Sequence, residues 1–420
     1  MPHRPMKHIT AQRGAATLVF TLALFAAMVL VVAYVNRNLV FEQRASANQA
    51  RATQAFEAAE TGLEWAQAQL NATGRTGTDC RPSSDASALP FRERALTYRR
   101  ADASFVPATW LQGGVAVPRQ AACVRVADGW QCSCPDAAMP AVAGPIGAPA
   151  FTVQFMATGN TGVVRLHATG CIANGSGCTA DATAASAQTD VALGLVPGLK
   201  TPPAAALTVR GSLDAGTAAL GAQHADVASG GFAIHTGGAL TAPHARVAGP
   251  AGAVADDAVV ANDSTLAALE ADDFFAAHFG MPLAAWVRQP VVGTVTCSAN
   301  CAAALEAAVG EGITDPLVHV QGDLPLDGPV VLGTPERPVL IVVDGAAQLR
   351  GAVTVHGLLY ARSLRWDDSA AGAQVRGAAL VEGDYRGNGT PDFTYDAAVL
   401  ALLKGRTGAF ARVNGSWRDF

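Results

Sequence analysis

The sequence predicts an α+β protein with a long N-terminal helix, a small disulfide-bonded α+β head and a largely β, solenoid-like region with short helices. Three observations lead to this prediction. An uncharged apolar run spans residues 15–35, and neither Gly nor Pro follows it before residue 62. All eight cysteines lie beyond this stretch. After residue 201, short apolar segments alternate with turns rich in small residues, as in stacked β-coils.

The N-terminal helix is predicted over residues 15–72. At about 1.5 Å per residue, a helix over the uncharged run crosses the roughly 30 Å hydrocarbon core of a membrane. Beyond the run the helix becomes amphipathic, because Phe56, Leu63 and Leu70 recur every seven residues and form one apolar stripe. We expect this stripe to pack on a globular domain and the helix to end near Asn71.

The orientation of this helix follows from the cysteines. Three Lys or Arg residues precede the apolar run and three follow it closely, so the positive-inside rule gives only a slight preference for a cytoplasmic N-terminus. An even number of cysteines on one side of the run indicates an oxidising environment on that side. We therefore expect a single-pass membrane protein whose large C-terminal part lies outside the cytoplasm.

The cysteines are expected to form disulfides rather than a zinc site. One residue separates Cys132 from Cys134, which is too short for a Cys-x-x-Cys zinc knuckle. The expected local bridges are Cys171–Cys178 and Cys297–Cys301. Four cysteines would pair among themselves in one of three ways, and the sequence leaves that choice open: Cys80, Cys123, Cys132 and Cys134.

Residues 73–200 are predicted to form the disulfide-bonded α+β head. Residues 152–155 and 164–168 alternate apolar and polar side chains, as half-buried strands do. Four arginines are interspersed with acids, and we interpret them as a solvated face: Arg92, Arg94, Arg99 and Arg100. The Pro- and Gly-containing stretch 197–203 marks the end of the head.

Residues 201–420 are predicted to form the β-rich region. Its very short segments at roughly ten-residue spacing favour a solenoid over a sandwich. A helical insertion is expected at about 262–310, with Ser264 capping a helix over 265–279 and a second helix over 302–309. A helix that follows Asp396 and a tail close the chain.

The sequence gives no sign of catalysis, nucleic-acid binding or a cofactor. It contains no Gly-x-Ser-x-Gly, P-loop or His-Glu-x-x-His motif. Charged residues make up 15% of the chain and the net charge is −5, whereas phosphate backbones require a basic surface. Adjacent carboxylates at 256–257, 272–273 and 367–368 are interpreted as caps and solvated turns, because neighbours in an extended chain point to opposite faces.

Metal binding has one candidate site, and we expect it to be a plain turn. Asp384, Asn388 and Asp392 place oxygen ligands around two glycines, a pattern that could wrap a calcium ion. However, Arg386 occupies a position where another acid would be needed. The histidines of neighbouring β segments are interpreted as surface or turn residues rather than metal ligands: His224, His235 and His244.

Two blocks in the first 63 residues resemble a known protein family. Residues 12–19 (QRGAATLV) resemble the processing site of type IV prepilins, in particular that of PilX-type minor pilins. Residues 54–63 (QAFEAAETGL) are similar to a second signature of the same family. The resemblance covers roughly the first 70 residues, and residues 413–420 also resemble the C-terminus of some larger members.

This resemblance implies processing, location and partners. Residues 1–14 would be a leader that a prepilin peptidase removes after Gly14, and the new N-terminal Ala15 would be methylated. The chain would be held in the inner membrane with a periplasmic head, and would then join a pilus at the cell surface. Its partners would be other minor and major pilins, which pack on the helix that carries Val19 and Phe20, and a surface ligand of unknown chemistry.

The fifth mature position suggests where in the filament the subunit lies. Major pilins carry Glu there, whereas this chain has Val19. A carboxylate in the membrane costs about 2.5–3.5 kcal/mol on insertion scales and is kept only when it has a partner, which in pilins is the N-terminus of the preceding subunit. A subunit that assembles first has no such partner. The resemblance therefore implies a priming or tip-proximal minor pilin.

Two alternatives stay open at this point. K-type pseudopilins of type II secretion also lack the acid and cap a filament tip, so the chain could belong to that system. An alternative of another class is a membrane-anchored β-solenoid protein that binds or degrades carbohydrate.

Overall fold

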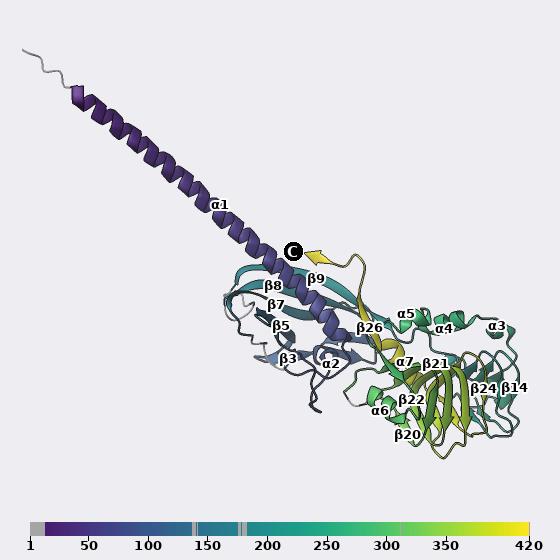
Figure 1. Ribbon diagram of the computed structural model, residues 1–420. Coiled ribbons are helices and arrows are strands. Elements are labelled where there is room, and N and C mark those ends of the chain that lie inside the picture. The colour runs from purple at the N-terminus through teal and green to yellow at the C-terminus, as the bar shows by residue number, and fades with distance from the viewer. Residues whose placement is uncertain are drawn as a thin grey trace, which may run out of the picture.

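The computed structural model describes residues 13–419 apart from 137–139, 141, 175–177, 179–182 and 311. Three parts follow one another in space: a long projecting helix, a sheet packed on the end of that helix, and a coiled β region beyond the sheet (Figure 1). The α+β class expected from the sequence is confirmed. Residues 1–12 of the expected leader lie outside the described residues.

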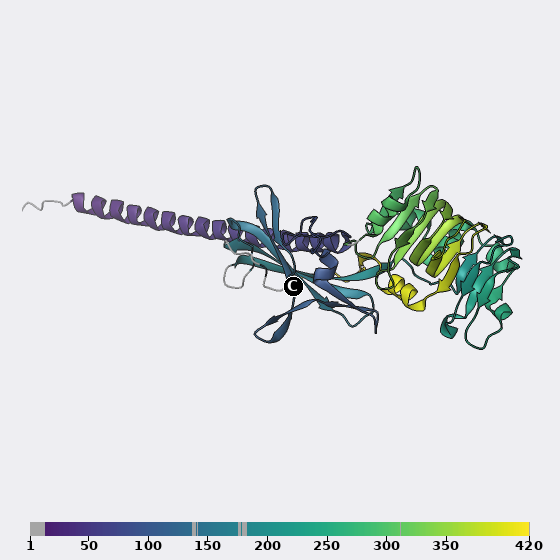
Figure 2. The ribbon, with the colours of Figure 1, turned by 90° about the horizontal axis from the view of Figure 1, so that it is seen from below.

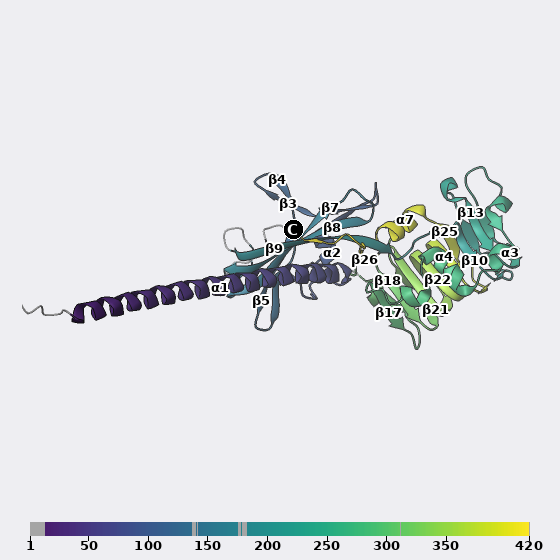
Figure 3. The ribbon, with the colours of Figure 1, turned by 90° about the horizontal axis from the view of Figure 1, so that it is seen from above.

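Helix α1 (Arg13–Asn71) is continuous. The chain contains neither Gly nor Pro between residues 15 and 61, the residue types that interrupt helices most strongly. Figures 2 and 3 show its first part as a straight rod that leaves the head, while its last part lies against the sheet.

The head is built on a seven-stranded antiparallel sheet in the order β26–β9–β8–β7–β5–β6, with β27 also paired to β9. Its strands are β5 (Gln120–Val126), β6 (Gly129–Ser133), β7 (Ile146–Ala157), β8 (Val163–Asn174), β9 (Thr183–Pro197), β26 (Gly408–Arg412) and β27 (Arg418–Asp419). The alternating segments 152–155 and 164–168 lie in β7 and β8. Buried side chains such as Phe155 and Leu166 form one core with Leu63 of α1.

Smaller elements surround this sheet. They are α2 (Phe91–Ala95), the hairpin β1 (Leu96–Arg99) with β2 (Ser104–Pro107), and the hairpin β3 (Thr109–Gln112) with β4 (Val115–Pro118). The β3–β4 hairpin projects sideways from the head (Figure 3).

Four disulfides involve all eight cysteines. Cys171–Cys178 and Cys297–Cys301 are the two bridges expected from proximity in the sequence. The choice that the sequence left open is resolved as Cys80–Cys134 and Cys123–Cys132. The second of these pairs lies directly across β5 and β6, whose register aligns the two cysteines.

The β-rich region is a stack of parallel coils with three strand ladders. The first ladder is β17–β18–β21–β22–β23–β10–β13–β16. The second is β19–β21–β22–β24–β11–β14, and the third is β20–β22–β23–β25–β12–β15. The long strands β21 and β22 turn from one ladder into another, so the chain winds around a common core.

The strands of this region have at most five residues before residue 300, and the three longer strands β21, β22 and β23 all follow it. The first group is β10 (Ala205–Val209), β11 (Leu213–Asp214), β12 (Gly221–Gln223), β13 (Phe232–Thr236), β14 (Leu240–Thr241), β15 (Arg246–Ala248), β16 (Val259–Val260) and β17 (Val292–Thr296). The second group is β18 (Leu317–Gln321), β19 (Leu324–Asp327), β20 (Val330–Leu332), β21 (Val339–Arg350), β22 (Val353–Asp367), β23 (Gln374–Val381), β24 (Tyr385–Arg386) and β25 (Asp392–Tyr395).

The order of coils in the stack differs from their order in the chain. The chain enters the stack in its middle at β10 and winds outward to β16. A helical segment then returns it to the opposite end at β17, from which it winds back until β23 pairs with β10. Leu207 therefore lies opposite Ala379 in a parallel ladder, and the two halves of the stack are joined by hydrogen bonds rather than by a connecting turn.

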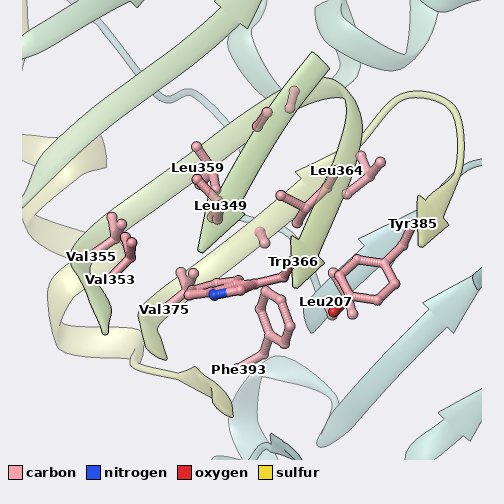
Figure 4. Close-up of a cluster of buried hydrophobic side chains, with 14 of the residues drawn as sticks. Leu207, Leu349, Val353, Val355, Leu359, Leu364, Trp366, Val375, Tyr385 and Phe393 are labelled. Atoms are coloured by element: carbon pink, nitrogen blue, oxygen red, sulfur yellow. The ribbon is translucent and has the colours of Figure 1, made fainter. Parts of the chain in front are cut away.

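The core at this junction is aromatic. Figure 4 shows the rings of Trp366, Tyr385 and Phe393 packed together beside Leu207. Phe393 stands edge-on to both neighbouring rings, with centroids 5.9 Å and 6.1 Å away. All four side chains are fully buried, so this cluster fastens the second half of the stack to the first.

The helical insertion differs from the prediction in detail. It comprises α3 (Ser264–Ala267), α4 (Ala271–Phe279), α5 (Leu283–Trp286) and α6 (Ala302–Val309). Two short 3-10 helices, η1 (Val227–Ser229) and η2 (Ala255–Ala258), precede it. The N-cap of α3 is Asp263, not Ser264, because the Asp263 carboxylate accepts hydrogen bonds from the Thr265 and Leu266 amides. Glu270 is extended, which divides the expected helix into α3 and α4.

The tail corrects the expected domain boundary. Helix α7 (Ala397–Gly405), capped by Asp396, packs on the coiled region. The following strands β26 and β27 pair with β9, so the end of the chain belongs to the head sheet rather than to the β-rich region.

Candidate functional site

The N-terminal half of α1 is the most unusual surface of the described chain. Residues 15–54 are all exposed, and none is charged before residue 37. Val19 and Phe20 are 64% and 67% exposed. The helix is long and apolar enough to cross a membrane. Its second threonine is already satisfied, since the Thr21 hydroxyl lies 3.0 Å from the carbonyl oxygens of Thr17 and Leu18.

The C-terminal half of α1 is packed through small side chains. The buried stripe follows helical spacing: Ala55, Ala58, Ala59, Leu63, Ala66 and Leu70. A Cβ on Gly170 of β8 would lie only 2.0 Å from the Ala55 carbonyl oxygen, so glycine is required for this approach. Gly62 likewise lies against the sheet, with Phe151 3.1 Å from the position of an added Cβ.

Phe56 lies at the edge of this packed stripe rather than inside it. It is half-buried and meets the ring of Trp417 edge-on at 6.4 Å. The tail is also held to α1 by charge, because Arg412 donates to the Glu64 carboxylate at 2.7 Å. Where α1 ends, the Asn71 amide forms two hydrogen bonds with the backbone of Phe410. The tail, whose strands extend the head sheet, therefore holds the C-terminal half of α1 through these contacts.

The predicted solvated arginine face is wrong for Arg92. This side chain is 6% exposed and donates to the carbonyl oxygens of Leu70 and Gly408 at 2.9 Å. It lies 3.7 Å from the Asp315 carboxylate, which also pairs with Arg406 at 2.7 Å. Burial lowers the pKa of Arg92, and Asp315 acts against that shift. The sequence could not reveal this junction, because Asp315 and Arg406 are both more than two hundred residues from Arg92 in the chain.

The calcium candidates do not face a common point. The Asp384 carboxylate accepts a hydrogen bond from the Ser212 amide, Asn388 accepts one from the Asp368 amide, and Asp392 pairs with Arg246 at 2.8 Å. In the part of the chain that the structure describes, no three His, Cys, Asp or Glu side chains form a group that could hold a metal ion.

The three histidines are separated as well. His224 is buried, donates to the Phe232 carbonyl oxygen at 2.6 Å and stacks on Tyr395. His235 pairs with Asp263 at 2.8 Å, and this hydrogen bond lowers the pKa of Asp263. His244 is exposed. Each has its own environment, so they do not act as one site.

Of the adjacent carboxylates, Asp367 departs from the expected solvated turn. Its side chain is 9% exposed and is paired with Arg365 of the same strand. The other pairs agree with the interpretation as caps and turns, since residues 256–257 lie in η2 and residues 272–273 in the first turn of α4.

The comparison with known protein families finds a match on the N-terminal helix. Residues 13–64 match the PilX N-terminal family. Among solved structures, the competence-associated pilin ComZ from Thermus thermophilus aligns with 13% sequence identity and a TM-score of 0.22, over 88% of this chain and 97% of that chain. No curated protein matches. The family match falls on the segment in which the sequence resembles pilins.

Proposed function

We propose that this chain, a type IV pilin-like protein, is a minor pilin or pilus assembly subunit that acts by packing and surface contact rather than by catalysis. A prepilin peptidase would remove the leader after Gly14 and expose Ala15 for methylation. The mature subunit would wait in the inner membrane with its head in the periplasm, and would then enter a pilus through contacts with other minor and major pilins.

The observation that carries this proposal is the exposed half of α1. Exposure of an apolar helix of this length to water is unfavourable, because large side chains such as Val19, Phe20 and Phe25 lie on its surface. A membrane covers residues 15–35 before assembly, and the helices of neighbouring subunits would replace lipid in a filament. The same helix would then serve as anchor and assembly surface in turn.

A position at or near the tip follows from Val19. A subunit added after another would need a partner for the preceding N-terminus, and valine cannot supply one. The bulky β-rich region supports the same position, since it extends the head at the end opposite the free half of α1 (Figure 1). We interpret this region as a β-solenoid that presents a surface for adhesion.

The experiment is gene deletion scored for piliation and twitching, beside a strain that carries Gly14→Ala. Loss of pili in both strains is expected, because an unprocessed subunit cannot enter the filament. Normal pili and twitching after deletion would contradict the pilus role. Lost protein secretion with normal pili would instead assign the chain to the K-type pseudopilins. Immunogold labelling spread evenly along filaments would contradict the tip position.

A further inference from the structure

A hollow of about 530 Å³ lies on the outer surface of the coiled β region. Its lining includes outward-facing residues of three adjacent strands: Gln348 and Arg350 of β21, Arg365 and Asp367 of β22, and Arg386 of β24 with the preceding Asp384. The strands that line the hollow belong to the β-rich region, which lies beyond the head at the end opposite the free half of α1 (Figure 1). None of these residues contributes to the contacts between α1 and the head.

The register of the coils places two arginines side by side. Arg365 lies directly opposite Arg386 in the parallel ladder between β22 and β24, where neighbouring strands are about 4.8 Å apart. Like charges directly opposite each other destabilise a sheet. Both side chains are well exposed, at 64% and 72%. Two exposed guanidinium groups at this spacing can bind one anion between them.

The arginines are only partly neutralised by their own strands. Arg365 pairs with Asp367, and Arg386 lies 3.4 Å from the Asp384 carboxylate. Arg350 lies opposite Asp367 in the register between β21 and β22 and adds a third guanidinium against two carboxylates. The hollow thus has one more arginine than aspartate, and its carboxylates can accept hydrogen bonds from uncharged donors such as hydroxyl groups.

The presence of both arginines and aspartates in the hollow favours a ligand that carries a negative charge and hydrogen-bond donors. Guanidinium groups bind carboxylates in a bidentate manner, and Asp384 can accept hydrogen bonds from hydroxyl groups. A uniform polyanion such as DNA would be repelled by Asp367 and Asp384, and the chain as a whole is acidic. A sugar that carries one carboxylate and several hydroxyls matches both kinds of group.

We propose that this arginine hollow binds an acidic sugar residue, a uronate of a surface polysaccharide. The carboxylate of the sugar would lie between Arg365 and Arg386. The hydroxyl groups of the sugar would donate hydrogen bonds to Asp384 and to the side-chain oxygen of Gln348. The inference deepens the proposed adhesive role of the subunit and rests on that role for placing the hollow outside the cell.

The test is calorimetric titration of the detergent-solubilised full chain with a short oligogalacturonate, beside the neutral oligogalactose and single-stranded DNA. Saturable binding of the oligogalacturonate alone is expected, and it should weaken as salt screens the charges. The double substitution Arg365→Gln/Arg386→Gln should weaken it by about tenfold or more, since each charge-assisted hydrogen bond contributes on that scale.

The matched control is Arg362→Gln. Arg362 is on the same strand, is 55% exposed and is paired with Asp344, but it does not line the hollow, so its loss should leave affinity near the wild-type value. The double variant removes a repulsion but also two ion pairs, one of them with Asp367, whose side chain is only 9% exposed. Its melting temperature is therefore compared with that of the wild type. If it melts earlier, Ser363→Trp fills the hollow without removing an arginine and should also abolish binding.

The proposal is overturned if oligogalacturonate does not bind, if oligogalactose binds equally well, or if the variants keep wild-type affinity. DNA binding through the same arginines without oligogalacturonate binding would overturn it too. These outcomes are independent of the pilus role, because the titration needs no pilus. Conversely, a deletion strain with normal pili would remove the pilus role and leave the measured sugar affinity unchanged.

Discussion

The indole Nε1 of Trp417 donates a hydrogen bond to the Glu60 carboxylate at 2.8 Å and so joins the end of the chain to its N-terminal helix across 357 residues. The same indole ring meets Phe56 edge-on. Just before it, the Ser416 hydroxyl accepts a hydrogen bond from the Ala192 amide of β9 at 3.0 Å. The tail, which follows the whole β-rich region in the sequence, thereby holds α1 against the head sheet.

Replacing Trp417 with alanine should release the tail from α1. The substitution removes one hydrogen bond and one edge-to-face ring contact, together worth about 1–2 kcal/mol. Hydrogen exchange of the β27 amides should accelerate, while exchange in β7 and β8 stays unchanged. Glu60→Gln is the matched control, because the amide oxygen can still accept from the indole. Equal protection of β27 in W417A and the wild type would show that the tail is held by other contacts.

Gly170→Ala should disrupt the packing of α1 on the sheet. The new Cβ would lie 2.0 Å from the Ala55 carbonyl oxygen and 2.3 Å from the Ala59 amide nitrogen, and backbone atoms cannot rotate away. Overpacking of this kind costs about 1–3 kcal/mol or more. Urea unfolding of the head should shift accordingly. Gly74→Ala is the control, since nothing lies within 4 Å of its added Cβ; identical midpoints for the two variants would contradict the close approach.

Asp315→Asn should destabilise the junction between head and β-rich region by about 3 kcal/mol. This is the scale of the loss when one partner of a buried ion pair is removed and the other charge stays buried. Arg92 would stay buried without its carboxylate. Asparagine tolerates the left-handed backbone of this position, where φ is +48°. The loss of stability therefore comes from the missing negative charge and not from backbone strain. Limited proteolysis should separate the two regions sooner in this variant.

The control for that experiment is Asp344→Asn, which removes the exposed pair with Arg362. An exposed pair contributes only about 0–1 kcal/mol. If proteolysis of the Asp315 and Asp344 variants proceeds at the same rate, the buried cluster does not hold the junction together.

Removal of Cys80–Cys134 should cost more stability than removal of Cys297–Cys301. In the chain-entropy model the first bridge, with a sequence separation of 54, is worth about 4 kcal/mol, and the second, with a separation of 4, about 2 kcal/mol. Paired Cys→Ser variants, unfolded in urea without reductant, provide the comparison. A larger loss from the Cys297–Cys301 pair would reverse the expected order.

Features governed by nearby residues could be predicted from the sequence. The unbroken α1, the stripe through Leu63 and Leu70, and the Asp396 cap of α7 each depend on a few neighbouring side chains. The α3 cap shows the limit of such signals, because Asp263 and Ser264 are both good capping residues and only the fold selects the first. The break at Glu270 has a local sign that the predicted single helix overlooked, namely the acidic residues 272–273 in the first turn of α4.

Features that depend on the order of coils could not be predicted. Arg365 lies opposite Arg386 only because β24 follows β22 in the ladder, and Leu207 lies opposite Ala379 only because the stack is entered in its middle. The burial of Arg92 likewise requires Asp315 and Arg406 from distant segments. The neighbours of these residues are determined by which distant segments pair with one another, and not by the residue types themselves.

A processed pilus subunit is incorporated into pili without its leader. Pili sheared from the cells can be analysed by mass spectrometry for the N-terminal peptide of this chain. We expect the protein to be present in the sheared fraction and to begin at methylated Ala15. A chain that keeps Met1 and is found only in the membrane fraction would show that the protein is not a processed pilus subunit.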